Sequence, residues 1–77
     1  MNIETEIKKI MAEILGVSED EIEEDSAIGD LPNWDSLSHL KIIAEIEKKF
    51  DFQFTPDVLM DIEDFSDMVK ATKDRVS

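Results

Sequence analysis

The residues best suited to chemistry lie in the stretch NWDSLSHL, residues 33–40. This stretch holds a carboxylic acid, a hydroxyl and an imidazole, at Asp35, Ser36 and His39. They are the residue types of a hydrolase triad, and a helix would place Ser36 and His39 on neighbouring parts of its surface. Asp35, however, adjoins the serine and does not orient the histidine, and no GxSxG elbow occurs in the sequence. We therefore predict no catalytic residue and no enzymatic activity.

The rest of the chain offers little other chemistry. It contains no cysteine, which excludes disulfides, thiolate metal sites and cysteine nucleophiles. The acidic segment SEDEIEEDSAIGD, residues 18–30, does not keep the alternating ligand register of a calcium-binding EF-hand loop. No metal site is predicted.

The charge balance restricts the partners. Twenty acidic residues against eight basic ones give a formal net charge of −12. Nucleic acid is excluded as a partner and anionic membranes are disfavoured, because binding phosphate requires clustered Lys and Arg. Residues 19–35 hold eight acids and no base: Glu19, Asp20, Glu21, Glu23, Glu24, Asp25, Asp30 and Asp35. Such a concentration of charge favours partners with basic docking patches.

The length of 77 residues permits one small domain, residues 1–77. No apolar run approaches the length of a membrane span, and the first ten residues lack the apolar core of a signal peptide. We expect a cytoplasmic, soluble protein that is a monomer.

The elements that must position Ser36 are predicted to be helices. In the first, apolar residues recur with helical spacing from Ile3 to Leu15, and Gly16 follows as a C-terminal cap. A long acidic loop comes next, with room for one short helical turn. Four apolar residues are expected to hold this loop to the core: Val17, Ile22, Ile28 and Leu31. The second helix is predicted from Ser36 to Phe50, with Asp35 as its N-cap.

The C-terminal part begins with FDFQFTP, residues 50–56, where three phenylalanines alternate. Because no partner strand is available, we predict an extended connector with its rings turned inward. A short third helix should run from Pro56 to about Asp61, and a last helix from about Glu63 to Arg75. Its narrow apolar face comprises Phe65, Met68, Val69, Thr72 and Val76. The predicted fold class is all-α: a small four-helix bundle of three main helices plus one short helix, with a long acidic loop between helices 1 and 2.

The second helix has a wider apolar arc than one core contact needs. At ~100° per residue, a core stripe forms on one side of Ser36, from Ile42, Ile43, Ile46 and Phe50. A second set, Leu37, Leu40 and Ala44, falls on the other side of Ser36. It serves either to pack against the long loop or to dock partners. His39 lies within the core arc and is interpreted as a semi-buried residue near the loop.

With these elements in place, the chain resembles an acyl carrier protein of the phosphopantetheine-carrying family. The resemblance covers nearly the whole chain and rests on Asp35-Ser36-Leu37 at the start of the second helix, in this charge and helix context. In that family the motif serine, here Ser36, bears 4′-phosphopantetheine, transferred from coenzyme A by a phosphopantetheinyl transferase. The resemblance thus implies a carrier that presents acyl thioesters to acyl-loading and acyl-processing enzymes and does no chemistry itself.

The same resemblance makes the second helix the recognition helix. It implies apolar docking positions at Leu37, Leu40 and Ala44. It also implies acidic contacts, at Asp35 and Glu47, for basic patches on the partners.

Three residues depart from typical fatty-acid-synthesis carriers. Lys41 and Lys48 stand where those carriers have acids, and Trp34 where they have a smaller residue. We interpret Trp34 as loop packing over the core and not as a partner anchor. The departures favour a free-standing, specialised carrier over the housekeeping fatty acid carrier. Two alternatives stay open: an aminoacyl or peptidyl carrier, and an acidic helical adaptor that is never modified.

Overall fold

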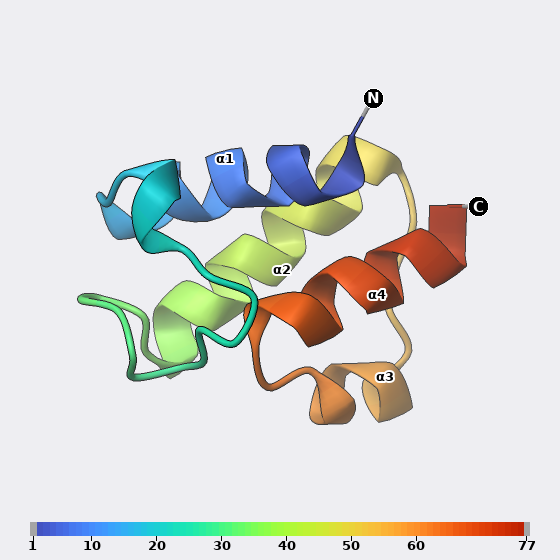
Figure 1. The fold of residues 1–77 in the computed structure, drawn as a ribbon. Coiled ribbons are helices and arrows are strands. Elements are labelled where there is room, and N and C mark those ends of the chain that lie inside the picture. Colours follow the sequence, from blue (N-terminus) through green and yellow to red (C-terminus); the bar gives the residue numbers. More distant parts are fainter. Residues whose placement is uncertain (1, 77) are drawn as a thin grey trace.

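The computed structural model describes residues 2–76 and is built from helices (Figure 1). The main helices are α1 (Ile3–Leu15), α2 (Ser36–Phe50) and α4 (Phe65–Val76). Two short elements complete the fold, the 3-10 turn η1 (Glu19–Glu21) and the helix α3 (Pro56–Asp61). Residues 2–76 contain no strand, only an isolated bridge between Ala27 and Asp64. The predicted all-α fold, with three main helices and one short one, is confirmed.

The helix boundaries follow from local capping. Gly16 ends α1 in the left-handed conformation (φ 71°) and donates its N–H to the Ala12 carbonyl. Asp51 ends α2 in the same way, with φ 57°. Pro56 begins α3, where its missing N–H costs nothing. The bounds predicted for α2 and α3 agree with the structure.

The last helix begins two residues later than predicted. The Asp64 carboxylate accepts a hydrogen bond from the Asp67 N–H (2.8 Å), which is the contact of an N-cap residue. Asp64 also pairs with Ala27 in the isolated bridge. Because Asp64 caps the helix and pairs with Ala27, it lies outside α4. The helix therefore starts at Phe65 and not at Glu63.

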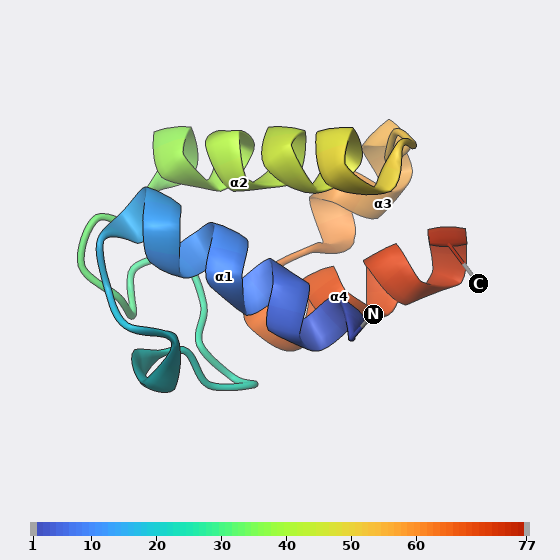
Figure 2. The same cartoon turned by 90° about the horizontal axis from the view of Figure 1, so that it is seen from above.

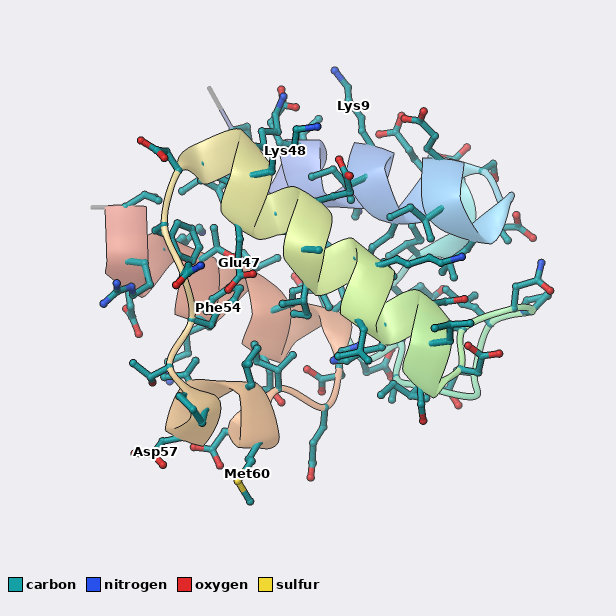
Figure 3. All side chains as sticks on the ribbon, turned by 180° about the vertical axis from the view of Figure 1, so that it is seen from behind. Lys9, Glu47, Lys48, Phe54, Asp57 and Met60 are labelled. Atoms are coloured by element: carbon teal, nitrogen blue, oxygen red, sulfur yellow. The ribbon has the colours of Figure 1, made fainter. Side chains whose placement is uncertain are left out.

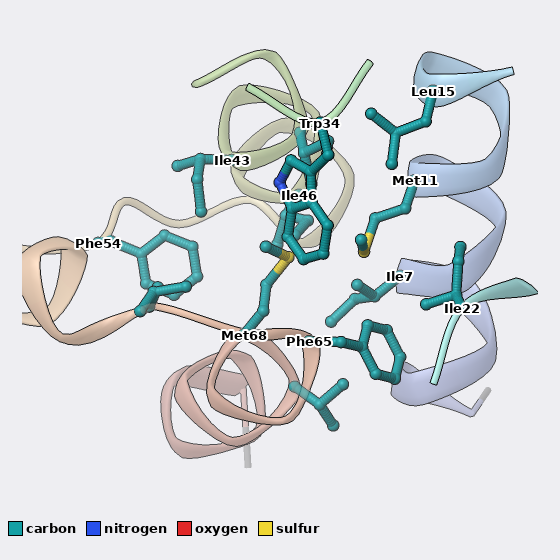
Figure 4. Packing of buried hydrophobic residues seen from close by; sticks show 13 residues of the cluster. Ile7, Met11, Leu15, Ile22, Trp34, Ile43, Ile46, Phe54, Phe65 and Met68 are labelled. Carbon is teal, nitrogen blue, oxygen red and sulfur yellow. The ribbon is translucent and has the colours of Figure 1, made fainter. Parts of the chain in front are cut away.

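One hydrophobic cluster joins the helices and the long loop (Figure 4). α1 contacts both α2 and α4, and Figure 2 shows α2 on one side of the molecule with α1 and α4 on the other. The buried apolar residues are Ile7, Met11, Leu15, Ile22, Trp34, Ile42, Ile43, Ile46, Phe54, Ile62, Phe65, Met68 and Val69. The core stripe predicted for α2 is therefore buried, with Phe50 partly so.

Two predicted core residues are exposed. Ile28 is 42% exposed, since the tight turn at residues 28–30 extends away from the helices. Val76 is 38% exposed, because it lies in the last turn of α4, beyond the buried residues Met68 and Thr72. In the connector, Phe54 is buried and Phe52 partly buried, with their rings edge to face at 4.8 Å. The connector prediction is confirmed.

The acidic loop is held against α4 by its backbone. The Ser26 carbonyl accepts the Phe65 N–H (2.9 Å), and the Glu24 carbonyl accepts the Ser66 N–H (3.0 Å). These two N–H groups belong to the first turn of α4, which has no partners for them within the helix. The loop thus stabilises α4 while its acidic side chains stay exposed.

Core packing makes a direct stability prediction. Ile46 is fully buried, so Ile46→Val should lower the free energy of unfolding by about 0.5–1.5 kcal/mol. Leu40→Ala, at a 62% exposed position of the same helix, should change it by no more than about 0.5 kcal/mol. Urea unfolding followed by Trp34 fluorescence measures both. Equal losses in the two variants would contradict the assigned inward face of α2.

Candidate functional site at the start of α2

Ser36 is the first residue of α2, and its side chain is exposed. The residue before it, Asp35, is the N-cap: its Oδ1 accepts a hydrogen bond from the Ser38 N–H at 2.9 Å. This backbone hydrogen bond holds the pKa of Asp35 below its usual range, so the carboxylate is ionised at neutral pH. The helix therefore begins with an anion and an accessible hydroxyl next to each other.

The segment before Ser36 is fixed by backbone geometry. Asn33 adopts a left-handed conformation (φ 68°), which asparagine tolerates better than most residues. Its side-chain amide donates to the Leu15 carbonyl at 3.1 Å, and so ties the loop to the last turn of α1. The Trp34 carbonyl accepts the Gly29 N–H at 2.9 Å. These contacts determine where α2 begins.

Trp34 anchors the site to the core. Only 2% of its surface is exposed, although it lies two residues from the exposed Ser36. Its indole Nε1–H donates to Nδ1 of His39 at 3.2 Å, and the two rings stack with centroids 6.2 Å apart. The interpretation of Trp34 as core packing is confirmed, and His39 is partly buried beside it, as expected.

These contacts leave the three triad-like residues unconnected. Nδ1 of His39 is occupied by the Trp34 N–H, so a neutral His39 carries its proton on Nε2. Asp35 caps the backbone and does not contact the imidazole. Among residues 2–76, no hydrogen bond links Ser36 to His39. Within residues 2–76, His39 is therefore not placed as a general base for Ser36.

The residues predicted to dock partners lie along α2 in different environments. Leu37 and Leu40 are 64% and 62% exposed. Lys41, Ala44 and Lys48 are exposed as well. Lys41 lines a pocket with residues of α1, and Lys48 lines another with residues of the connector.

Glu47 differs from the other predicted docking residues. It is partly buried, and its Oε2 accepts a hydrogen bond from the Phe54 N–H at 2.8 Å (Figure 3). Its carboxylate therefore holds the connector to α2. Composition and helical spacing could not show this contact, because it joins residues on two different elements.

Met60 was not singled out from the sequence. It is 81% exposed on α3, on which it points outward (Figure 3). A six-residue helix is too short for apolar periodicity to separate its inner and outer faces. No group of three or more metal-ligand side chains is gathered within residues 2–76, and no helix of that part is long and apolar enough to cross a bilayer.

Comparison with known proteins gives this site its family. Residues 5–72 match the family described as the phosphopantetheine attachment site, a range that includes all of α2. The chain belongs to this family. The prosthetic group of this family is 4′-phosphopantetheine, as the sequence predicted.

Relatives of this carrier-family chain cover nearly all of it. An acyl carrier protein of Chlamydia trachomatis is 31% identical over 75 residues, 97% of each chain. An acyl carrier protein of Chlamydia muridarum is 29% identical over the same length, again 97% of each chain. A non-reducing polyketide synthase of Emericella nidulans is 35% identical over 71 residues, which is 92% of this chain and 3% of the synthase.

The start of α2 fits a phosphodiester-linked group. It offers an exposed hydroxyl at the first helical position. The N-terminus of a helix favours negative charge, because its first N–H groups lack partners within the helix. The buried Trp34 keeps the backbone below the hydroxyl fixed.

The Trp34–His39 contact predicts a pH dependence of stability. Burial lowers the pKa of the His39 imidazole below its ordinary value of about 6.5. As the pH falls, His39 binds a proton in the unfolded chain before it does so in the folded chain. Its contribution to the free energy of unfolding is therefore complete above pH ~6.5 and is lost below it. The free energy of unfolding should therefore fall between about pH 7.5 and 5.5.

The matched variant is His39→Gln, which stays neutral and can still accept the indole N–H. Its free energy of unfolding should fall less over the same range, measured by urea unfolding at the two pH values. An equal fall in both proteins would show that other groups cause the dependence.

Proposed function

We propose that Ser36 is the residue that bears 4′-phosphopantetheine, joined through its Oγ in a phosphodiester. The observation that carries this proposal is the exposure of Ser36 at the first position of α2, within the range that matches the family. A separate phosphopantetheinyl transferase makes this transfer, with coenzyme A as the donor. Asp35 is the motif acid beside it.

The chain works as an acyl carrier. When bound, the phosphopantetheine arm supplies a thiol, absent from this cysteine-free chain, on which acyl groups are held as thioesters. The residues of the chain present the arm: Trp34 fixes the start of α2, and Leu37 and Leu40 offer apolar contact beside Ser36. The protein itself catalyses no step. Its partners are the transferase and the acyl-loading and acyl-processing enzymes, and the relatives named acyl carrier protein support this proposal.

Lys41 and Lys48 favour a specialised, free-standing carrier as the form of this proposal. Such a carrier works as a monomer in the cytoplasm, where coenzyme A is available. An aminoacyl or peptidyl carrier would use Ser36 in the same way and differ only in its cargo. An unmodified adaptor is disfavoured by the accessible Ser36.

Intact mass tests the attachment site. The protein is incubated with coenzyme A, magnesium and a broad-specificity phosphopantetheinyl transferase, and a gain of one phosphopantetheine group is expected. Ser36→Ala should gain nothing. Ser38→Ala is the matched control, since Ser38 lies two residues further in the same turn and should not be needed. Modification of Ser36→Ala would place the arm on another residue.

The exposed leucines predict the docking side of α2. Leu37→Ala or Leu40→Ala should lower kcat/KM of the transferase by about tenfold, mainly through KM, as expected for the loss of one apolar anchor. Met60→Ala, on α3 and 81% exposed, is the control and should change kcat/KM by less than about twofold. Initial rates at varied carrier concentration measure this. A larger effect at Met60 would move the docking surface to α3.

A further inference from the structure

Two aromatic side chains fill the core on the inner side of the helix that begins with Ser36. Trp34 and Phe54 are only 2% and 6% exposed, and both rings point into the hydrophobic cluster from different segments (Figure 4). Resting on the carrier function proposed above, we propose that these rings close the core to the cargo. The acyl group of this carrier is therefore short or polar, and it is carried in water outside the helices.

The room inside the core decides which cargo the carrier suits. Ser36 starts a helix whose inner side packs into the hydrophobic cluster. A long aliphatic chain attached there would gain from entering the core, since each methylene moved out of water favours burial about fourfold. It would stay outside only where the core holds no space for it. A short or polar acyl group has little to gain from burial in either case.

Trp34 occupies the space beside the first turn of α2. Its indole N–H donates to Nδ1 of His39 at 3.2 Å, and the two rings stack with an angle of 26° between their planes. The same cluster contains Met11, Leu15 and Ile46, none of them more than 1% exposed. A chain entering here would have to displace the indole and leave its N–H without an acceptor in apolar surroundings, which is costly.

Phe54 fills the core on the side of the connector. Its backbone N–H donates to Oε2 of Glu47 at 2.8 Å, and its ring meets the Phe52 ring edge to face at 4.8 Å. The guanidinium of Arg75 lies over the Phe52 ring, 5.8 Å from the ring centroid. The connector is thus held to both α2 and α4. Phe54 can leave the core only by giving up these contacts.

The larger hollows of residues 2–76 lie elsewhere on the molecule. They are found between α1 and α2, along the connector, between α3 and α4, and between α1 and α4, with volumes of about 300 to 800 Å³. Neither Ser36 nor Trp34 lines any of these hollows. Charged side chains line all four, so these hollows do not offer an aliphatic chain the apolar surroundings of a core.

A long chain that stayed outside would add to an apolar surface that is already exposed. Leu37 and Leu40, close to Ser36 on α2, are 64% and 62% exposed. A larger continuous apolar patch favours association between protein molecules. An acyl group of about two to four carbons, or one that bears hydroxyl, amino or carboxyl groups, adds little apolar surface. The burial of Trp34 and Phe54 therefore favours a cargo of this class.

Acyl groups of two lengths test the inference. The transferase loads Ser36 from acetyl-coenzyme A or from octanoyl-coenzyme A, and intact mass confirms each load. Hydrolysis of the two thioesters is then followed by mass at one pH, on the protein and on free pantetheine. The ratio of the octanoyl rate to the acetyl rate should agree between the two to within about twofold, because the protein shields neither chain from water.

Amide spectra of the ¹⁵N-labelled protein give a second readout. The indole N–H signal of Trp34 and the amide signals of Ile42, Ile43 and Ile46 should be the same with either load, because the longer chain does not enter the core. Shifts of these signals with octanoyl alone would overturn the inference. A decrease of more than about tenfold in the octanoyl-to-acetyl ratio on the protein would overturn it as well.

Removal of the indole should open the core. In Trp34→Ala the octanoyl-to-acetyl ratio should fall at least about tenfold, since each methylene that enters the space left by the ring favours burial about fourfold. Met60→Ala is the matched control, because it removes an apolar side chain that is 81% exposed. Its ratio should equal that of the unchanged protein. A folded Trp34→Ala that leaves octanoyl unshielded would show that Trp34 does not exclude the chain.

The comparison of the two loads on the unchanged protein decides the inference even if Trp34→Ala does not fold. A chain that takes no phosphopantetheine from coenzyme A loses the carrier function, and with it the cargo inference that rests on that function. A chain that is loaded on Ser36 but shields octanoyl loses only the inference, and is a carrier that buries long aliphatic acyl groups.

Discussion

The burial of Trp34 is the contact on which the site depends. The indole is almost fully enclosed by the core, and its N–H donates to His39, in the first turn of the helix that follows. The chain is therefore fixed on both sides of Asp35 and Ser36. A residue can be fully exposed and still well placed when its neighbours in sequence are buried. Ser36 gains this combination from Trp34, and a flexible loop could not supply it.

A long acidic loop before α2 would be expected to loosen so small a domain by charge repulsion. The structure avoids this loosening because the acidic side chains of the loop lie in water while its backbone is held by hydrogen bonds. All eight acids of residues 19–35 are exposed to water, while the carbonyls of Glu24 and Ser26 accept the first N–H groups of α4. The loop satisfies donors that a helix start leaves open. Its acidic side chains are therefore available to partners, and the loop stays bound to α4.

Helical spacing and capping residues predicted most of this architecture. The bounds of α2, the Gly16 cap of α1 and the Pro56 start of α3 all depend on local preferences, which a sequence displays directly. What could not be predicted depends on contacts between distant segments. Ile28 has the hydrophobicity of a core residue but falls in a turn that extends outward, and Asp64 delays α4 because it pairs with Ala27. Ser36 could be singled out by its motif, whereas the engagement of Glu47 required the connector to be in place.

That engagement changes how the charge of α2 should be understood. On a helical wheel the opposite charges of Glu47 and Lys48 nearly cancel, so this part of α2 is predicted to be neutral. In the folded chain the Glu47 carboxylate accepts the Phe54 N–H and is held beside the connector, while Lys41 and Lys48 are exposed. The hydrogen bond holds the Glu47 carboxylate in place but leaves its charge, so α2 presents acids beside its lysines, within a protein that carries a charge of −12. Long-range attraction and short-range docking then select different features of a partner, because only the nearest charges act unscreened at contact.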